Sequence, residues 1–397
     1  GGRLPPGFIL LSVVVARMRF TIWAYPWGVL DEGPRQVVSR LRSLGVEELS
    51  LATNYHTVQA FTPHNPERRT LFATANSYFR PGGRYGRLEP APYEGMDGDW
   101  LADITAALDG FPVTSWTVGC HNSKLGMANP EVTIESPHGD DLVFGLCPSH
   151  PAVQKYLTAL VGDLADRGLN RIELETFDYF HGTGFGWHHQ KIHSELGVLG
   201  EFLMRLCFCE HCRTNAAESG INVDDARSVA QDGLDDIVAG TVPHGLSPEQ
   251  FLRARPSLEA YVDARRSTLT ALYADLERAA DGTPLGYYLG TPTPGREHLA
   301  GVDLDALADH IDYYLLPAYE SSREAVVEAY RTADAVTPDV PLHVGVLPGR
   351  PAVEDTGTVV DIVDGLRAVG VPRVAFYNYG LLPDRALERI GAATGGR

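Results

Sequence analysis

The chain has 397 residues, of which 44% are hydrophobic and 21% are charged, a balance typical of a globular protein with a large core. Its formal net charge of −18 at pH 7 argues against nucleic acid and anionic membranes as partners, whereas neutral ligands such as sugars are unaffected by that charge. No stretch approaches the roughly 20 consecutive apolar residues that would span a membrane.

Residues 1–17 contain a short apolar run, 8–16, and no clear cleavage site follows it. We expect residues 1–17 to be a disordered or non-native extension, with the remnant of a secretory signal as the alternative. Native structure is expected to begin near Met18, and residues 18–397 to form one domain. Five cysteines, three of them within six residues, favour metal binding over disulfides and therefore a reducing, cytoplasmic compartment.

Short apolar runs alternate with amphipathic stretches along the chain. We predict strands at 19–27, 47–52, 113–118, 171–174, 285–289, 313–317, 342–346 and 373–377. Helical patterns lie between them, at 34–44, 100–108, 152–167, 322–333, 359–369 and 384–392. Eight strands that each precede a helix predict a parallel sheet closed into a (β/α)₈ barrel of the TIM type. An open doubly wound sheet is the alternative, but no glycine-rich fingerprint follows the first strand.

Two long segments interrupt this alternation. Residues 54–98 follow the second strand and are rich in Pro, Gly, Arg and aromatic residues, whereas residues 176–282 follow the fourth strand and look largely helical after Gly200. Both leave the C-terminal ends of strands, where the loops of a barrel form its active site. We expect 54–98 to be a long loop and 176–282 to be an insertion or a small helical subdomain.

The sharpest local motif is Cys207-Phe208-Cys209-Glu210-His211-Cys212. Thiolates at this spacing can converge on one tetrahedral Zn²⁺ ion, which needs four ligands in a closed structural site. We choose Cys147 as the fourth ligand, with His211 and Cys120 as alternatives. Such an ion would fasten the long insertion to the barrel.

The fourth strand continues Arg171-Ile172-Glu173-Leu174-Glu175 and leads to Asp178. Because side chains alternate along a strand, Ile172 and Leu174 should face the helices while Glu173 and Glu175 point into the barrel. Glu175 lies at the rim, where aromatic surroundings would raise its pKa and suit it to proton donation. The alternative is a buried structural carboxylate paired with Arg171 or another base, and a structural role is our prediction for the deeper Glu173.

Hydrolysis of a glycosidic bond usually needs two carboxylates. The candidates for the second catalytic carboxylate are Glu320, which ends strand six, and Asp178. Glu320 could equally be a charge near the start of the next helix.

Aromatic and polar residues follow many of the predicted strands. Sugar rings present apolar C–H faces that pack on aromatic rings, and hydroxyl groups that bond to Asn, His and Tyr. The predicted substrate-binding residues are Trp23, Tyr25, Tyr55, His56, His64, Asn65, His121, Asn122, His181, His188, His189, Tyr319, Tyr377 and Asn378. Asn54, Trp187 and Tyr379 accompany them.

At Leu146-Cys147-Pro148-Ser149-His150-Pro151 and at 207–212 the chain resembles glycoside hydrolase family 42, the zinc-containing β-galactosidases of the large barrel clan. This resemblance implies that Cys147, Cys207, Cys209 and Cys212 bind zinc and that Glu175 is the acid/base. The chain departs from that family in strand seven, Leu342 to Pro348, which carries no carboxylate where the nucleophile should stand. The usual Asn-Glu pair of strand four is Leu174-Glu175.

A closer resemblance is to uncharacterised bacterial barrel proteins regarded as glycosyl hydrolases. It covers most of the barrel and rests on Tyr55-His56, Pro63-His64-Asn65-Pro66, His121-Asn122, Leu146-Cys147-Pro148-Ser149, Leu174-Glu175, His188-His189 and the cysteine motif.

Three hypotheses follow. The first is a glycoside hydrolase that acts on a small carbohydrate or glycoside, with structural zinc as its only cofactor and a homo-oligomer left open. The second is a metal-dependent barrel isomerase or hydrolase, whose ion is held by His56, His121, His181, His189 or Glu175. The third is a carbohydrate-binding barrel without catalysis.

Overall fold

The structure is a computed structural model that describes residues 17–82, 84–179, 191–243, 245–289 and 296–396. Eight parallel strands close into a ring, because β1 pairs with both β2 and β13. In order around the ring they are β1 (Arg19–Ala24), β2 (Glu48–Tyr55), β6 (Val113–Val118), β9 (Arg171–Glu175), β10 (Leu285–Tyr288), β11 (Tyr313–Pro317), β12 (Leu342–Val346) and β13 (Arg373–Phe376). The predicted (β/α)₈ barrel is therefore confirmed, and the doubly wound alternative is wrong.

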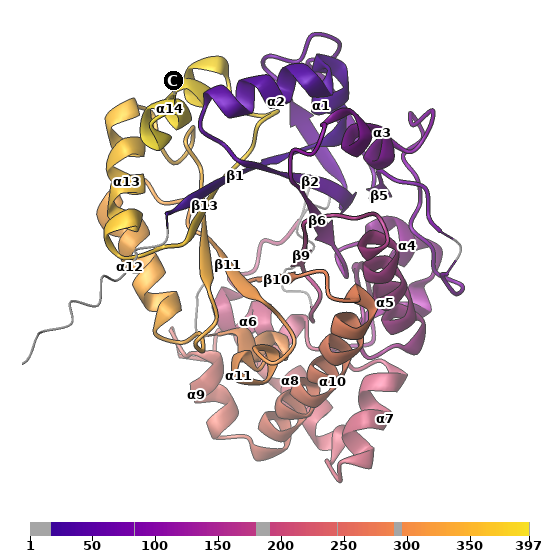
Figure 1. Cartoon of the computed structure of the whole chain (residues 1–397). Helices are drawn as coiled ribbons and strands as arrows, with labels where there is room; N and C mark the ends of the chain where they lie inside the picture. Colours follow the sequence, from indigo (N-terminus) through magenta and orange to yellow (C-terminus); the bar gives the residue numbers. More distant parts are fainter. Residues whose placement is uncertain (1–16, 83, 180–190, 244, 290–295, 397) are drawn as a thin grey trace, which may run out of the picture.

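Helices surround the ring of strands (Figure 1), and every connection between neighbouring barrel strands contains at least one. The longer ones are α2 (Pro34–Ser43), α3 (Trp100–Ala107), α5 (Pro151–Ala165), α10 (Pro256–Ala280), α12 (Arg323–Asp334), α13 (Thr356–Ala368) and α14 (Asp384–Thr394). Asp99, Ser322 and Asp355 each accept a hydrogen bond from the backbone N–H three residues ahead, which satisfies a donor of the first helical turn. No helix within the described ranges is long and apolar enough to cross a membrane.

The first strand is shorter than the predicted 19–27. It ends at Ala24 because Pro26 begins a short helix, α1 (Pro26–Glu32), which the sequence analysis missed. Proline suits the first position of a helix, since its fixed φ is helical and its missing N–H would have no partner there.

The segment 54–98 folds into strands rather than a plain loop. β3 (Val58–Phe61) and β4 (Thr70–Ala73) form an antiparallel hairpin, which we call the rim hairpin, and β5 (Asn76–Ser77) pairs with the end of β2. Ala60, Leu71 and Ala73 are buried on one face of the rim hairpin, so it is packed onto the barrel.

The segment 176–282 is helical, as predicted, in its described part. It contains α6 (Gly197–Met204), α7 (Glu210–Glu218), α8 (Val223–Val238), α9 (Pro248–Arg253) and α10. α10 packs against α5 and also against α8, so it joins the outer ring of the barrel to the inserted helices. In Figure 1 these helices, drawn in pink to orange, lie together on one side of the molecule.

The segment between β6 and β9 was predicted to contain only a helix. It also includes α4 (Ser123–Ala128) and an antiparallel hairpin of β7 (Thr133–Glu135) and β8 (Asp141–Leu146), which delivers the chain to Cys147. The remaining short elements are two 3₁₀ helices, Pro130–Val132 and Glu297–Ala300, and α11 (Leu304–Leu307).

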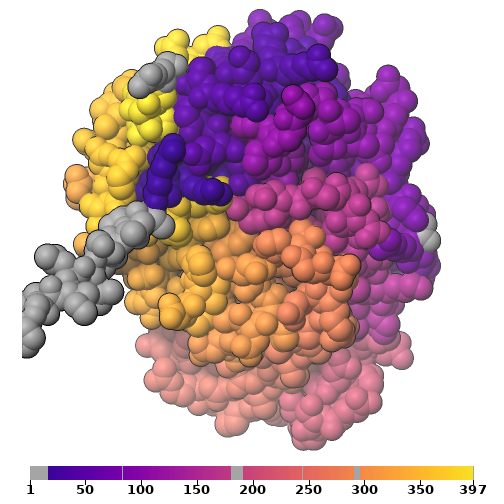
Figure 2. Space-filling view, in the orientation of Figure 1, coloured from indigo at the N-terminus to yellow at the C-terminus, as the bar shows by residue number. Residues whose placement is uncertain are grey.

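Two apolar cores stabilise the barrel. The larger lies between strands and helices, and the smaller lies inside the ring of strands, around Trp23, Trp116 and Tyr288. Gly345 makes room there, because a Cβ at this position would come within 2.7 Å of the Trp23 ring. On the face seen in Figure 2, atoms of neighbouring segments meet across the centre of the ring, as expected of a packed barrel interior.

Candidate active site

The fourth barrel strand, β9, carries the acidic residues of the site. Ile172 and Leu174 belong to the outer apolar core, whereas Glu173 bonds to side chains inside the ring. The predicted alternation of β9 is therefore confirmed. Its inward side chains, Arg171, Glu173 and Glu175, mark three successive depths from the N-terminal end of the barrel to its C-terminal rim.

Arg171 pairs with Glu48 of β2 and not with Glu175. Arg373, from the start of β13, donates to the other oxygen of Glu48 at 2.7 Å, and Thr114 also bonds to this carboxylate. Burial alone would raise the pKa of Glu48, but the charges of the two arginines and the hydrogen bonds to the carboxylate together outweigh burial and lower the pKa. Glu48, Arg171, Arg373 and Thr114 fill the N-terminal end of the barrel, where residues usually contribute to stability.

Glu173 occupies the middle of the barrel and is fully buried. Its Oε2 accepts hydrogen bonds from Ser50 Oγ at 2.6 Å, Trp23 Nε1 at 3.0 Å and the Tyr288 hydroxyl at 3.3 Å. Burial nevertheless raises its pKa. Trp23, predicted to bind substrate, is therefore an internal partner of this carboxylate.

Glu175 lies at the rim and is half-buried. Its Oε2 accepts a hydrogen bond of 2.5 Å from Trp116 Nε1 of the neighbouring strand β6. The pKa of Glu175 is raised to about 7. Burial is the main cause, the Trp116 bond acts in the opposite direction, and the charges of Glu173 and Asp178 also contribute to the increase. No ion pair joins Glu175 to a basic side chain of the described residues. Glu175 is thus a protonatable acid near neutral pH.

The chain turns sharply after Glu175. Thr176 has a φ of +56°, which a β-branched residue rarely adopts. Its carbonyl accepts the Cys120 N–H at 2.8 Å, and the Glu175 carbonyl accepts the Gly119 N–H at 2.9 Å. The loop after β6 therefore holds the backbone on both sides of the Glu175–Thr176 bond, in the kind of conformation that clusters at functional sites.

The two candidates for a second carboxylate lie in different environments. Asp178 is buried, its Oδ2 accepts the Tyr287 hydroxyl at 2.6 Å, and its Oδ1 has no hydrogen-bond partner in the part of the chain that the structure describes. Glu320 is exposed. Of these two, Asp178 is the one whose charge acts on Glu175.

Aromatic rings from three strand ends and from within β6 lie together on this side of the rim. Tyr55 packs edge-on against Trp116 with ring centroids 4.5 Å apart, and Tyr25 contacts both at 5.2 and 5.6 Å. Tyr377 lies 5.9 Å from Trp116, and its hydroxyl is 3.4 Å from that of Tyr25. We call Tyr25, Tyr55, Trp116 and Tyr377 the aromatic wall.

Two further predicted residues extend the aromatic wall. Tyr319 follows β11, is 38% exposed and packs on Tyr377 at 5.5 Å. His56 packs on Tyr55 at 4.2 Å and is stacked on His121 at 4.5 Å. Six of the predicted substrate-binding residues therefore lie together on this side of the rim: Tyr25, Tyr55, His56, His121, Tyr319 and Tyr377.

Other predicted ligand-binding residues have internal partners. His64 lies 2.8 Å from the Tyr379 carbonyl through Nε2 and 2.8 Å from Glu32 Oε1 through Nδ1. Asn65 caps the turn of the rim hairpin and donates to Asp31 at 2.9 Å.

Two asparagines likewise serve local structure. Asn122 accepts the Leu125 N–H and so caps α4, while Asn378 is fully buried and accepts the Gly380 N–H. His181, Trp187, His188 and His189 lie outside the described residues.

The four cysteines of the predicted zinc site meet in one cluster. From Cys147 Sγ, the sulfurs of Cys207, Cys209 and Cys212 lie 3.6, 3.6 and 3.5 Å away, and all four are within 4.8 Å of one another. A tetrahedral Zn²⁺ with Zn–S bonds of about 2.3 Å separates its sulfurs by about 3.8 Å, so the four residues fit this ion.

The alternative ligands are placed elsewhere. Cys120 and His211 do not belong to the four-sulfur group, and the His211 ring packs against His150 at 4.4 Å. Within the described ranges, this is the one place where three or more metal-binding side chains lie within reach of a single ion.

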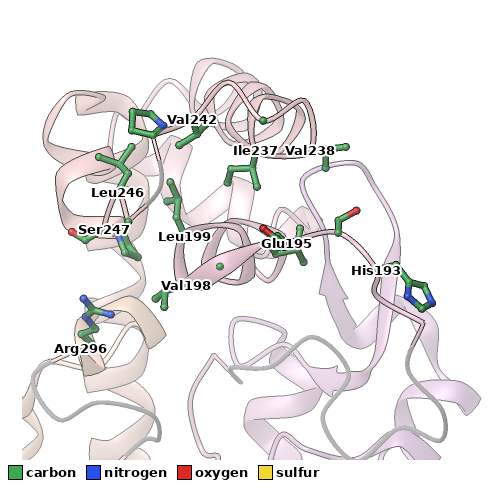
Figure 3. Close-up of a pocket in the computed structure, with 17 residues that line it drawn as sticks. His193, Glu195, Val198, Leu199, Ile237, Val238, Val242, Leu246, Ser247 and Arg296 are labelled. Atoms are coloured by element: carbon green, nitrogen blue, oxygen red, sulfur yellow. The ribbon is translucent and has the colours of Figure 1, made fainter.

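A separate groove of about 680 Å³ opens among α6, α8, α9 and the turn between the last two (Figure 3). Apolar side chains such as Val198, Ile237 and Leu246 line it, and Arg296 and His193 stand at its ends. Apart from Arg296, its described lining residues belong to the inserted segment, and it contains none of the aromatic wall.

The partner of Glu175 is the residue that sequence analysis missed. Trp116 lies in the third strand, two residues after Thr114, so both side chains point into the barrel. The alternation of side chains along 113–118 could therefore have indicated Trp116. What the sequence lacked was the register, which pairs Trp116 with Glu173 and Val118 with Glu175 across β6 and β9.

No protein-family model and no curated protein matches the chain. Solved structures do match it across the barrel. One is a β-galactosidase from psychrophilic Marinomonas ef1, 11% identical, with a TM-score of 0.57, over 95% of this chain and 59% of that one. Others are β-galactosidases from Bacillus circulans sp. alkalophilus (13% identity, TM-score 0.55, 96% and 56% covered) and Rahnella sp. R3 (12%, 0.54, 97% and 56%).

The class that fold and comparison define is therefore a (β/α)₈ barrel similar to those of solved glycoside hydrolases. At this level of identity, the likeness shows the fold alone. The chain spans less than 60% of the length of these β-galactosidases.

Proposed function

We propose that this protein is a glycoside hydrolase in which Glu175 protonates the leaving oxygen. The observation that carries the proposal is a half-buried carboxyl at the C-terminal rim whose pKa is about 7, beside a wall of aromatic rings. An acid with this pKa is protonated often enough at neutral pH to donate a proton and is a useful base once it has done so.

We propose Asp178 as the second carboxylate, in preference to Glu320. Asp178 lies on the same segment as Glu175, its charge acts on Glu175, and one of its oxygens has no partner within the described ranges. Tyr287 orients the other oxygen. This carboxylate would serve as the base or nucleophile that glycoside hydrolysis requires.

We also propose that Cys147, Cys207, Cys209 and Cys212 hold a structural zinc ion. Four thiolate ligands fill the tetrahedral coordination of Zn²⁺, so no position is left for water or substrate. The ion would join the chain after β8 to the start of α7, and the chemistry would rest on the carboxylates.

The test of the proposed function compares wild type with Glu175→Gln on two glycosides of one sugar. Methyl glycosides need a proton on the leaving oxygen, whereas dinitrophenyl glycosides do not. We expect a loss on the order of 10²–10⁴-fold for the methyl glycoside and a much smaller loss for the dinitrophenyl glycoside. Glu328→Gln, which changes an exposed residue of α12, is the control, and its activity on both glycosides should equal that of wild type.

Two outcomes would contradict the proposal. Equal losses on both substrates would remove the acid role from Glu175. Sugar binding by a wild-type protein that cleaves no glycoside, with affinity unchanged in Glu175→Gln, would instead identify a carbohydrate-binding barrel.

A further inference from the structure

His56 lies where β2 leaves the barrel rim. Its ring is held between two other rings, with Tyr55 at 4.2 Å and the stacked His121 at 4.5 Å. Tyr55 in turn packs on Trp116, which donates to Glu175. The imidazole therefore has a fixed orientation on the same wall as the proposed acid.

The tautomer of His56 follows from its hydrogen bond. Nδ1 lies 2.8 Å from the backbone carbonyl oxygen of Thr57, and a carbonyl oxygen can only accept, so Nδ1 carries the hydrogen. Burial lowers the pKa of His56 to about 4, so the ring is neutral in ordinary buffers. Nε2 then presents a lone pair and no hydrogen. The hydrogen bond of Nδ1 is the one that His56 makes within the described residues.

A neutral ring nitrogen of this kind selects hydrogen-bond donors. A sugar hydroxyl can donate to it, whereas an ether, a fluorine or a carbonyl oxygen at the same place cannot. Sites built to bond a hydroxyl discriminate strongly against analogues that lack it.

We infer that His56 is a specificity-determining residue whose Nε2 accepts a hydrogen bond from one hydroxyl group of the sugar bound beside Glu175. The inference rests on the proposed function, since it takes the donor to be a sugar hydroxyl. Tyr55 and His121 act as positioning residues that hold the imidazole in place.

The first experiment is ¹⁵N NMR of the full chain, with the His56 signals assigned by their loss in His56→Phe. Phenylalanine keeps a ring between Tyr55 and His121 and removes both nitrogens. We expect a protonated Nδ1 and an unprotonated Nε2 that does not titrate between pH 5.5 and 8. Addition of D-galactose, D-glucose or D-mannose should shift Nε2 toward the hydrogen-bonded position.

The second experiment measures binding of the sugar that shifts Nε2 and of its monofluorinated deoxy derivatives by calorimetry. One fluorinated position should bind the wild type about tenfold more weakly, and His56→Phe should abolish that difference. His138→Phe changes an exposed histidine in the turn between β7 and β8, and this variant should keep the tenfold difference in affinity.

The inference is wrong if Nε2 carries a proton, or if none of the three sugars shifts the Nε2 signal. Neither result bears on the role of Glu175, which the Glu175→Gln variant tests separately. If a sugar shifts Nε2 while Glu175→Gln keeps full activity, the proposed function fails and the assignment of His56 stands.

Discussion

Glu175 is subject to opposing influences from its neighbours. Burial and the negative charges of Glu173 and Asp178 favour its protonated form, whereas the Trp116 N–H favours the carboxylate. The Trp116 bond therefore keeps the pKa near 7 and not higher. Because a proton donor works best when its pKa is close to the working pH, this indole bond has a direct consequence for activity.

Trp116→Phe should raise the pKa of Glu175, because phenylalanine keeps an aromatic ring but has no N–H. Activity that depends on the protonated acid falls as the pH rises through this pKa. We therefore expect the alkaline limb of the kcat/KM profile to move upward by roughly one pH unit. A ¹³C NMR titration of the Glu175 carboxyl should show the same change.

Trp100→Phe is the matched control, since Trp100 belongs to the same apolar cluster and packs on Tyr78 and Tyr93. An alkaline limb that stays in place in Trp116→Phe, or that moves equally in both variants, would show that the indole bond does not tune Glu175.

For individual residues, the sequence predicted the direction of some side chains but not the partners of others. The inward direction of Glu173 and Glu175 follows from strand alternation alone, and the structure agrees. The internal partners of His64 and Trp23 could not be predicted, because Glu32, Tyr379 and Glu173 lie far away in sequence. A polar or aromatic residue at a strand end looks the same whether it faces a ligand or another part of the chain.

Among the elements, the cysteine cluster joins two different connections of the barrel, the one between β6 and β9 and the one between β9 and β10. Cys147 follows β8, whereas Cys209 and Cys212 lie at the start of α7, more than sixty residues later. The Phe208 N–H also donates to the Glu135 carbonyl of β7 at 2.8 Å. The β7–β8 hairpin and the inserted helices should therefore depend on the proposed ion for their mutual packing.

Zinc analysis by mass spectrometry tests this dependence. Wild type should retain about one zinc per chain after dialysis, Cys209→Ser should lose it, and its thermal unfolding should begin at a lower temperature. Cys120→Ser, which changes a buried cysteine outside the cluster, should keep the zinc. Zinc content that is equal in the two variants would refute the assignment.

His64, in the turn of the rim hairpin, connects the hairpin to the barrel. Nε2 of His64 is hydrogen-bonded to the Tyr379 carbonyl, and Nδ1 lies within ion-pair distance, 2.8 Å, of Glu32 Oε1. Since a carbonyl and a carboxylate oxygen can only accept, a doubly protonated ring suits these two partners. Burial by itself lowers the pKa of His64, but the bonds to Glu32 and Tyr379 outweigh it and raise the pKa above its usual value. Arg68 adds a bidentate pair with Asp31, at 2.6 Å for each bond.

A raised histidine pKa stabilises the folded form most at low pH. The stabilisation is complete below the unfolded pKa of about 6.5 and is lost as the pH rises through the folded value. Hydrogen exchange over residues 58–73, corrected for intrinsic rates, should therefore accelerate with increasing pH in wild type. In His64→Gln this extra pH dependence should disappear. An identical pH response in the two proteins would exclude the histidine as its source.

For the whole molecule, the buried charges at the N-terminal end of the ring matter most. Glu48 is in contact with Arg171 and Arg373 and joins strands β2, β9 and β13. Removal of one partner from a buried ion pair leaves the other charge without compensation, which commonly costs about 3–5 kcal/mol.

Glu48→Ala should lower the free energy of unfolding by about 3–5 kcal/mol, since two arginines would then lie together in the barrel. Urea denaturation measures this loss. Its neighbour offers the control: Glu47 pairs with the exposed Arg17, so Glu47→Ala should cost less than about 1 kcal/mol. Similar losses in both variants would contradict the structural role of the buried pair.

The barrel itself was predictable because its strands are continuously apolar and separated by amphipathic helices. Three of the predicted strands, 113–118, 313–317 and 342–346, match the structure in both bounds. The short β7–β8 and rim hairpins were missed, since their few residues give no periodic signal and their pairing depends on contacts with the barrel.

Strand β9 serves both stability and the proposed chemistry, because Arg171, Glu173 and Glu175 lie on the same face of it. A shift of β9 by one residue in its pairing with β6 and β10 would turn Ile172 and Leu174 inward and send Arg171, Glu173 and Glu175 toward the helices. Assembly of the barrel and placement of the proposed acid thus have one common determinant. Directed evolution that seeks a new substrate could change the loops freely, but it would have little freedom in these five residues.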